Sequence, residues 1–184
     1  MSILEIIAAT MGVLSVWYAR KNNVLVFPTG IVSVLIYVYI TYSYQIYAEA
    51  GINIYYFLMS VYGWILWTSK NKKIKKRISK NNKRDNINYI TFFIVLFFAL
   101  CLILNSTDSD VIFLDSITTA LSLTAMLLLA RRKLENWIYW IIADIIYIPL
   151  FIYKELYITS FQYFIFLVLA ISGYTEWKKL LRND

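Results

Sequence analysis

The amino-acid sequence predicts an all-α integral membrane protein with seven transmembrane helices. Of its 184 residues, 60% are hydrophobic and the mean hydropathy is +0.61, a composition typical of a chain that crosses a membrane several times. Apolar runs recur from one end to the other, and seven of them are long enough to span a bilayer at about 1.5 Å of rise per residue. The connections between these runs alternate between basic and nearly free of bases, as expected when they lie on opposite sides of a membrane.

Each expected span is an apolar run that ends at polar or charged residues. The first run stops before Arg20 and Lys21, and the second has Pro28 in its first turn, where proline is tolerated. The third run ends where a basic stretch, residues 70–84, begins. Seven helices are therefore expected, at residues 3–19, 24–42, 50–67, 89–104, 111–130, 137–153 and 158–177.

The positions of the basic residues predict the orientation of the chain. Nine of the 18 Lys and Arg residues lie in residues 70–84, and others follow the first, fifth and seventh spans. Lys154 is the one base on the remaining connections, so 17 bases lie on one side and one on the other. The positive-inside rule then places the N-terminus outside and the C-terminus in the cytoplasm. This topology explains the net charge of +7, so the lipid bilayer is an expected partner and nucleic acid is not.

The residue types that many enzymes and cofactor sites need are missing. The chain has no His and one Cys. This excludes a disulfide framework within the chain, Ser-His-Asp and Cys-His catalysis, and metal sites based on cysteine or histidine. We therefore expect neither an enzyme nor a protein with a cofactor or a metal centre.

Spans one to three resemble spans five to seven at a nearly constant offset along the chain. Gly63 and Trp67, near the end of the third span, correspond to Gly173 and Trp177 near the end of the seventh. The motif Tyr-Ala-Arg-Lys at 18–21 resembles Leu-Ala-Arg-Arg at 129–132, with a shift of one residue there. The expected organisation is a three-helix repeat in residues 1–67, a basic cytoplasmic loop and linker helix in 68–110, and a second repeat in 111–184. Parallel repeats of this kind occur in transporters that bind substrate between two halves.

Residues 137–144, Trp-Ile-Tyr-Trp-Ile-Ile-Ala-Asp, hold the main candidate site. Trp137, Trp140 and Asp144 fall on one face of a helix. Asp144 is expected deep in the bilayer, where an ionisable residue usually faces a cavity or a partner. Two indole rings beside a carboxylate suit a flat, cationic small molecule. The alternatives left open are an interfacial role for Trp137 and a purely structural hydrogen bond from Asp144 to a neighbouring Tyr or Thr.

Polar side chains on three other spans are expected to complete the pocket. They are Asn53, Tyr56 and Ser60 in the third span, Asp115, Thr118, Thr119 and Ser122 in the fifth, and Gln162 and Tyr163 in the seventh. Polar groups on membrane helices also join helices together by hydrogen bonds, so each of these residues has that alternative role. Asp115 is expected nearer the outer side, where it lines the entrance or bonds to a neighbouring helix.

These residues resemble the PnuC family of bacterial vitamin-precursor transporters, and the resemblance covers nearly the whole chain. The matching motifs are Tyr-Gly-Trp-Ile-Leu-Trp at 62–67, Asp115 with Thr118 and Thr119, the stretch 130–140 that leads into Asp144, and Gly-Tyr-Thr-Glu-Trp at 173–177. The resemblance implies a SWEET-like fold of three, one and three helices. It also implies facilitated diffusion of nicotinamide riboside by alternating access across the bacterial inner membrane, with a kinase inside the cell that traps the substrate by phosphorylation. Trp137 and Trp140 take the family's substrate-stacking positions, with Asp144 one turn on.

Other substrates and roles stay open. Thiamine is also a flat cation and suits the Trp pair and Asp144, whereas riboflavin is neutral and larger and fits less well. A substrate-binding subunit of a larger transport complex is a further alternative, which uptake by the purified chain alone would distinguish from a carrier. The helix-packing faces leave self-association into a homo-oligomer open.

Overall fold

The computed structural model describes residues 3–71, 76–105 and 111–183. Within these ranges the chain forms seven α-helices: α1 (Ile3–Arg20), α2 (Val26–Ser43), α3 (Tyr47–Thr68), α4 (Lys83–Leu104), α5 (Ile112–Ala130), α6 (Asn136–Tyr153) and α7 (Tyr157–Asn183). The prediction of an all-α chain with seven helices is confirmed. Parts of two predicted connections, residues 72–75 and 106–110, lie outside the described residues.

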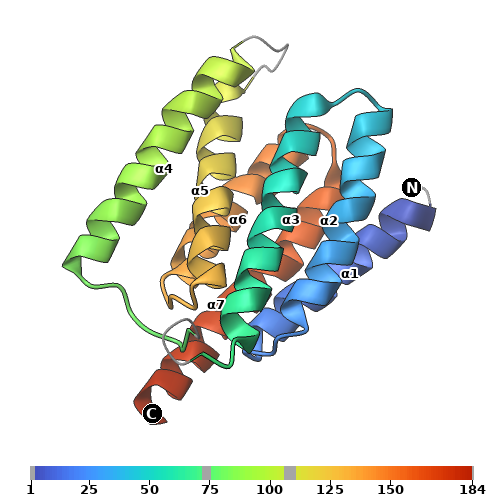
Figure 1. The fold of residues 1–184 in the computed structure, drawn as a ribbon. Coiled ribbons are helices and arrows are strands. Elements are labelled where there is room, and N and C mark those ends of the chain that lie inside the picture. Colours follow the sequence, from blue (N-terminus) through green and yellow to red (C-terminus); the bar gives the residue numbers. More distant parts are fainter. Residues whose placement is uncertain (1–2, 72–75, 106–110, 184) are drawn as a thin grey trace.

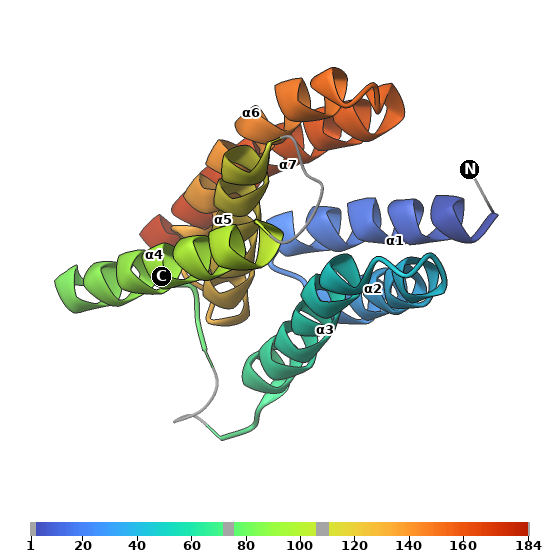
Figure 2. The ribbon, with the colours of Figure 1, turned by 90° about the horizontal axis from the view of Figure 1, so that it is seen from above.

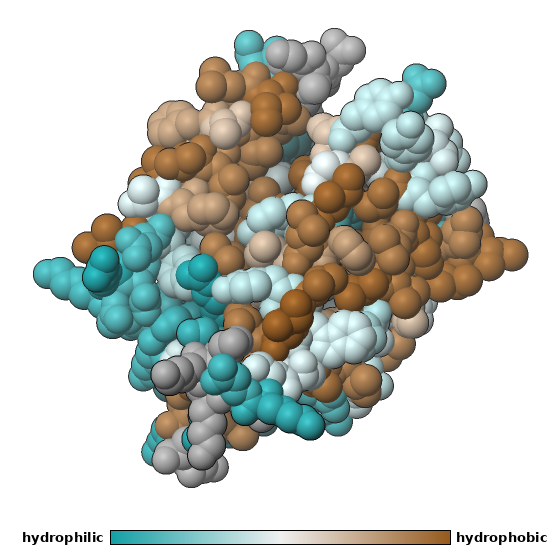
Figure 3. Space-filling view, viewed as in Figure 1, coloured by the Kyte–Doolittle hydropathy of each residue, from teal (hydrophilic) through white to brown (hydrophobic). Residues whose placement is uncertain are grey.

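Six of the seven helices, all except α3, are long and apolar enough to cross a membrane. α3 has 22 residues, which is also long enough, but Glu49, Asn53 and Ser60 lower its hydropathy. Apolar side chains cover much of the outer flanks, which Figure 3 shows in brown, and Leu102 on α4 is 76% exposed. Such a surface needs a lipid environment, so the chain is a multi-pass membrane protein.

Most helix ends lie close to the predicted ones, with two exceptions. α4 begins at Lys83 rather than at residue 89, because Asn82 and Asp85 form a capping box. In it, the Asp85 amide donates to Asn82 Oδ1 at 2.7 Å and the Asn82 amide donates to the Asp85 carboxylate at 3.3 Å. α7 continues past the predicted end at residue 177 to Asn183. Both extensions are polar, so the apolar runs did not include them.

Six helices form a closed ring through their packing contacts, and α4 lies outside this ring, beside α5 (Figure 1, Figure 2). α1, α2 and α3 pack against one another in chain order, as do α5, α6 and α7. We call these sets the first half and the second half. Two junctions close the ring: α3 packs against α5, and α1 packs against α7. In the part of the chain that the structure describes, α4 packs against α5 alone.

The two halves turn between helices in the same way. Positive φ angles occur at four non-glycine residues among those described, and Asn22 and Gln45 in the first half correspond to Arg132 and Glu155 in the second. The backbone bonds match too, because the Asn22 amide donates to the Ala19 carbonyl and the Arg132 amide donates to the Leu129 carbonyl, both at 2.9 Å. The predicted shift of one residue in this turn is therefore wrong, since the offset that relates Gln45 to Glu155 also relates Asn22 to Arg132.

The two ends of the ring differ in charge. The α1–α2, α3–α4 and α5–α6 connections lie together with the C-terminus at the lower end in Figure 1, which we call the basic end. The α2–α3 and α6–α7 turns lie at the opposite end. Hydrophilic side chains gather at the basic end, where Figure 3 shows them in teal.

Candidate functional site

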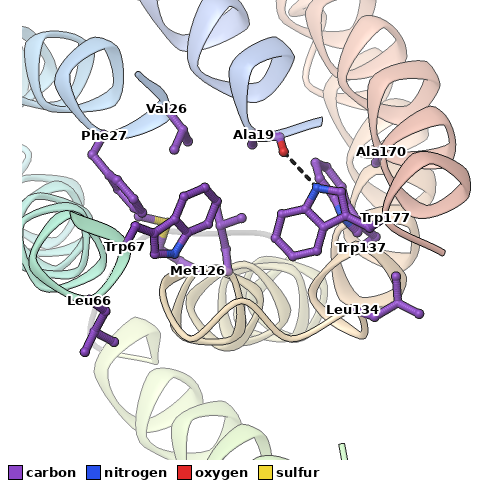
Figure 4. Close-up of a cluster of buried hydrophobic side chains, with 11 residues drawn as sticks. Ala19, Val26, Phe27, Leu66, Trp67, Met126, Leu134, Trp137, Ala170 and Trp177 are labelled. Atoms are coloured by element: carbon purple, nitrogen blue, oxygen red, sulfur yellow. Dashed lines mark hydrogen bonds between the residues drawn. The ribbon is translucent and has the colours of Figure 1, made fainter. Parts of the chain in front are cut away.

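Four large aromatic side chains close the centre of the ring at the basic end (Figure 4). Phe27 packs edge-on against Trp67 with ring centroids 4.9 Å apart, and Trp137 packs edge-on against Trp177 at 5.5 Å. Trp67 and Trp177 meet between these pairs at 6.0 Å. All four side chains are buried. This aromatic cluster joins α2 and α3 of the first half to α6 and α7 of the second.

Two indole hydrogen bonds cross between the halves at the aromatic cluster. Trp67 Nε1 on α3 donates to the Ala130 carbonyl at the end of α5, at 3.1 Å. Trp177 Nε1 on α7 donates to the Ala19 carbonyl near the end of α1, at 2.9 Å (Figure 4). The Arg132 guanidinium lies over the Trp67 ring, 3.9 Å from its centroid. Burial lowers the pKa of Arg132 to about 10, which leaves it protonated at neutral pH and able to hold this cation–π contact.

Trp137 is part of this packing. Its side chain is 1% exposed, and it lies against Gly173 on α7, where an added Cβ atom would be 2.6 Å from the ring carbon Cη2. Its Nε1 donor is buried and has no hydrogen-bond partner among the described residues. Protein encloses the ring in this conformation, so the stacking role expected for Trp137 stays a prediction.

Asp144 lies two turns further along α6 and is isolated. The residue is 2% exposed, and within the described ranges no group donates a hydrogen bond to its carboxylate or forms an ion pair with it. The structural hydrogen bond to a neighbouring Tyr or Thr is therefore not present here. A buried acid without a partner is costly, and in membrane helices such a group usually serves a ligand.

An aromatic wall continues from Asp144 towards the opposite end. Tyr147 and Phe151 on α6 stack with centroids 5.4 Å apart and 15° between their planes. Tyr163 on α7 lies against both rings, at 4.4 and 5.0 Å. Tyr163 is also close enough to Asp144 for the two groups to interact electrostatically. The wall therefore places aromatic surface beside the isolated carboxylate.

Hydroxyl groups from α3 and α5 face this wall. Ser122 on α5 lies near the phenol groups of Tyr56 on α3 and Tyr147 on α6. The buried Ser122 Oγ makes no hydrogen bond to any residue that the structure describes. Thr119, one turn earlier on α5, also lies near Tyr147. Four helices thus bring a carboxylate, phenols and hydroxyls to one region of the ring.

Four further predicted residues lie on the helices that form this region. Trp140 is half-buried against the aromatic cluster, one turn from Asp144, and Gln162 is half-buried on α7. Asn53 is half-buried on α3, where its amide donates to a carbonyl of the same helix at 2.9 Å. Ser60 is buried beside Gly30 on α2, so it packs inside the first half.

Asp115 forms an ion pair at the opposite end of the ring. Lys154 Nζ, just after α6, lies 2.7 and 2.9 Å from the two carboxylate oxygens of Asp115. Glu49, at the start of α3, is near enough to interact electrostatically with both. Asp115 therefore bonds to a neighbouring element, which is one of its two predicted roles, and its part in an entrance stays a prediction.

Two residues of the aromatic wall, Tyr147 and Phe151, were not among the predicted site residues. Tyr147 and Phe151 follow Trp140 and Asp144 at steps of three or four residues, and this spacing keeps all four on one face of α6. Extending that stripe along the helix would have found both. Tyr163 was expected beside Gln162 among the polar residues of the seventh span, but its contact with α6 depends on which face of α7 packs there, which no spacing within α7 provides.

A ring of apolar helices around carboxylate, phenol and hydroxyl groups is the arrangement expected of a membrane transporter for a small molecule. The match of a family model supports this class and makes it specific. The chain belongs to the family described as Nicotinamide mononucleotide transporter, whose model matches residues 2–179. This membership confirms the predicted class, a transporter and not an enzyme, and the predicted family.

Known relatives are similar to almost the whole chain. The Nicotinamide riboside transporter PnuC of Escherichia coli (strain K12) is 26% identical over 204 residues, covering 96% of this chain and 85% of that protein. The Nicotinamide riboside transporter PnuC of Neisseria mucosa is 24% identical, covering 98% of this chain and 73% of that protein. A solved structure described as the crystal structure of the Vitamin B3 transporter PnuC has a TM-score of 0.76 at 23% identity, covering 98% of this chain and 82% of that chain. That likeness confirms the predicted fold class.

Proposed function

We propose that this protein carries nicotinamide riboside across the bacterial inner membrane by facilitated diffusion. The observation that carries the proposal is Asp144, a buried carboxylate without a partner in the described residues, beside the aromatic wall. Nicotinamide riboside is a flat pyridinium cation with ribose hydroxyls. A binding site for it therefore needs an anion, an aromatic surface and hydrogen-bonding groups together. Two relatives named for this substrate cover 96% and 98% of the chain.

Each group at the centre of the ring has a proposed role. Asp144 offsets the pyridinium charge, and the wall of Tyr147 and Tyr163 supplies aromatic surface. A desolvated cation–π contact there is worth about 2 kcal/mol. The Tyr56 and Ser122 hydroxyls bind the ribose. Contacts from the surrounding positions complete the pocket: Trp140, Asn53, Thr119 and Gln162, with Ser60 behind them and Asp115 at the entrance.

Trp137 takes part after a change of conformation. The aromatic cluster closes the basic end, and the indole bonds of Trp67 and Trp177 hold it closed. In the proposed alternating access, the two halves separate there and both bonds break. Because Gly173 on α7 and Trp137 on α6 belong to the same half, α7 must also shift against α6 within that half. This second movement uncovers the indole ring for stacking with the substrate as it leaves.

The two halves act as two copies of a three-helix unit joined by α4, an arrangement of three, one and three helices. The equal turns at Asn22 and Arg132 support this, as do those at Gln45 and Glu155. α4 packs against α5 alone among the described elements, as a linker would. Parallel repeats of this kind move against each other around a site between them.

The basic end faces the cytoplasm in the proposed orientation, with the N-terminus outside, because 17 of the 18 Lys and Arg residues lie on the connections and tail of that end. A cysteine introduced at Tyr44, at the opposite end, should react with an impermeant reagent added to intact cells in a Cys101→Ala background. Facilitated diffusion alone moves the substrate only as far as electrochemical equilibrium, so a cytoplasmic kinase that phosphorylates the substrate makes uptake one-way.

Binding and uptake by the purified chain alone test the proposal. Calorimetry with nicotinamide riboside, thiamine and riboflavin side by side should show micromolar binding of nicotinamide riboside, about 8 kcal/mol of binding free energy. Liposomes containing the protein, held at zero membrane potential, should take up this substrate until the inside and outside concentrations are equal. Tight binding of thiamine instead would identify thiamine, the other flat cation, as the substrate. Binding without uptake would contradict a carrier and favour a substrate-binding subunit.

A further inference from the structure

We infer that the basic end holds a binding site for a phosphate group, separate from the transport site. A cavity of about 320 Å³ lies there between the end of α3, the connection before α4, the first turns of α4 and the α5–α6 turn. Its wall includes Tyr62, Ser79 and Tyr89 together with four charged residues. None of these residues belongs to the proposed transport site, so the inference stands without the transport proposal.

The cavity carries an excess of positive charge. Three bases, Lys76, Arg131 and Lys133, line it with one acid, Asp85. Lys133 Nζ forms an ion pair with the Asp85 carboxylate at 2.8 Å, which neutralises one base. Arg131 donates to the Tyr89 hydroxyl at 3.3 Å and contacts no carboxylate within the described ranges. Two positive charges are therefore left for an anion.

Hydrogen bonds fix the wall of the cavity. The Ser79 amide donates to the Arg132 carbonyl at 3.0 Å, and the Leu134 amide donates back to the Ser79 carbonyl at 2.9 Å. Arg132 Nη1 donates to the Lys76 carbonyl at 2.8 Å. These bonds dock residues 76–79 on the α5–α6 turn. Orientation by the positive-inside rule needs only basic charge, so it does not account for a docked connection that encloses a cavity.

The donors around the cavity suit phosphate oxygens. A guanidinium binds phosphate through two parallel hydrogen bonds, and lysine ammonium and serine hydroxyl groups add further donors. Basic pockets between membrane helices on the cytoplasmic side bind phospholipid head groups, and a soluble phosphate monoester offers the same chemistry. Tyr89 is buried where the apolar part of α4 begins, so the cavity borders the expected level of the head groups.

Binding to the purified full chain tests the inference. Calorimetry in detergent uses inorganic phosphate and glycerol 3-phosphate as soluble probes. Melting temperatures in phosphatidylcholine nanodiscs, with and without phosphatidylglycerol, probe the lipid source. The test variants are Arg131→Gln and Lys76→Gln. Lys21→Gln is the matched control, because Lys21 holds the position equivalent to Arg131 in the α1–α2 turn and covers the Trp17 ring at 3.9 Å, outside the cavity.

We expect Arg131→Gln to weaken phosphate binding about tenfold, since it removes a charge-assisted hydrogen bond, while Lys21→Gln binds as the unchanged protein does. Binding of the soluble monoester supports a soluble phosphate ester as the ligand. A rise in melting temperature with phosphatidylglycerol alone, lost in Arg131→Gln, supports a lipid head group. The inference is overturned if no probe has an effect. It is also overturned if Arg131→Gln and Lys76→Gln both respond to every probe like the unchanged protein.

Discussion

Gly63 and Gly173 hold corresponding places in the two halves of the ring, and each lies directly against an aromatic ring of the preceding helix, Phe27 or Trp137. Four residues after each glycine, a tryptophan indole bonds to a carbonyl of the other half. At the basic end, each half therefore has the same two features: a glycine packed on an aromatic ring, and an indole hydrogen bond to the other half.

Matching positions diverge deeper in the second helix of each half. Gly30 in α2 is close to Ser15, because an added Cβ atom would lie 3.0 Å from the Ser15 hydroxyl. The residue at the corresponding position of α6 is Trp140. Val34 in α2 likewise corresponds to the isolated Asp144 in α6. The turns and the glycine–aromatic contacts are alike in the two halves, whereas the buried carboxylate of Asp144 lies in the second half. This difference fits the proposal that one asymmetric ligand binds between two similar halves.

Asp144→Asn should break this asymmetry with the largest effect. The amide keeps the size of the side chain but removes the charge, and a charge-assisted interaction is worth up to about 3 kcal/mol. We expect affinity for nicotinamide riboside to fall about 100-fold in calorimetry, with liposome uptake reduced in parallel. Val34→Ala, at the matching position, is the control and should bind normally. Unchanged affinity in Asp144→Asn would contradict a charge-based site.

Replacing Gly63 or Gly173 with alanine compares how tightly the glycine packs on its aromatic ring in the two halves. An added Cβ at Gly63 would lie 2.6 Å from Phe27 Cζ and 3.1 Å from the Ala130 backbone, whereas the closest atoms at Gly173 belong to the Trp137 ring. A ring shifts more easily than a backbone. Overpacking lowers the stability of the folded state by about 1–3 kcal/mol. We therefore expect a loss of about 2 kcal/mol for Gly63→Ala and about 1 kcal/mol for Gly173→Ala. Melting temperatures in detergent measure both, and equal losses would show that the Ala130 backbone sets no limit.

The same contacts show how much of the fold the sequence could predict. Helix ends were predicted well where an apolar run meets a turn, as at Ala130 and Tyr153. The start of α4 was placed too late because its first turn is polar, although the capping box formed by Asn82 and Asp85 was readable in the sequence.

The candidate site was predictable in part. Asp144 stood out because a carboxylate inside an apolar run is rare and costly. The packing of Trp137 on Gly173, in place of an open face, depends on how α6 meets α7. The repeat related Trp67 to Trp177, but which carbonyl each indole reaches depends on how the halves face each other. Contacts between distant helices are not encoded in the spacing within any one of them.

The two crossing indole bonds should differ in strength. In Trp67→Phe the Ala130 carbonyl loses its indole donor, and the Arg132 guanidinium also loses its preferred indole face. In Trp177→Phe the Ala19 carbonyl still accepts from the Asn22 amide at 2.9 Å. A buried acceptor without a donor costs about 1–3 kcal/mol, and a lost but compensated bond costs less. We expect melting curves to show a loss of stability of about 1.5 kcal/mol for Trp67→Phe and about 0.7 kcal/mol for Trp177→Phe. A larger loss for Trp177→Phe would contradict the idea that the Asn22 amide compensates the Ala19 carbonyl for its lost indole donor.

The ion pair at the opposite end has no counterpart in the sequence of the first half, because the positions matching Asp115 and Lys154 are Glu5 and Tyr44. Lys154→Met should therefore remove a feature that the shared scaffold does not need. Its partly exposed groups, with side-chain exposures of 32% and 21%, are screened by water and salt, so we expect a loss of about 0.5 kcal/mol.

The measurement is the melting temperature of Lys154→Met at low and high salt, with Lys154→Arg as the matched control that keeps the charge. The small difference between the two variants should vanish at high salt. Lys154→Met also removes a base that interacts electrostatically with Glu49, so any added loss should shrink with screening as well. A loss as large as that of Gly63→Ala, persisting at high salt, would contradict a screened ion pair of small effect.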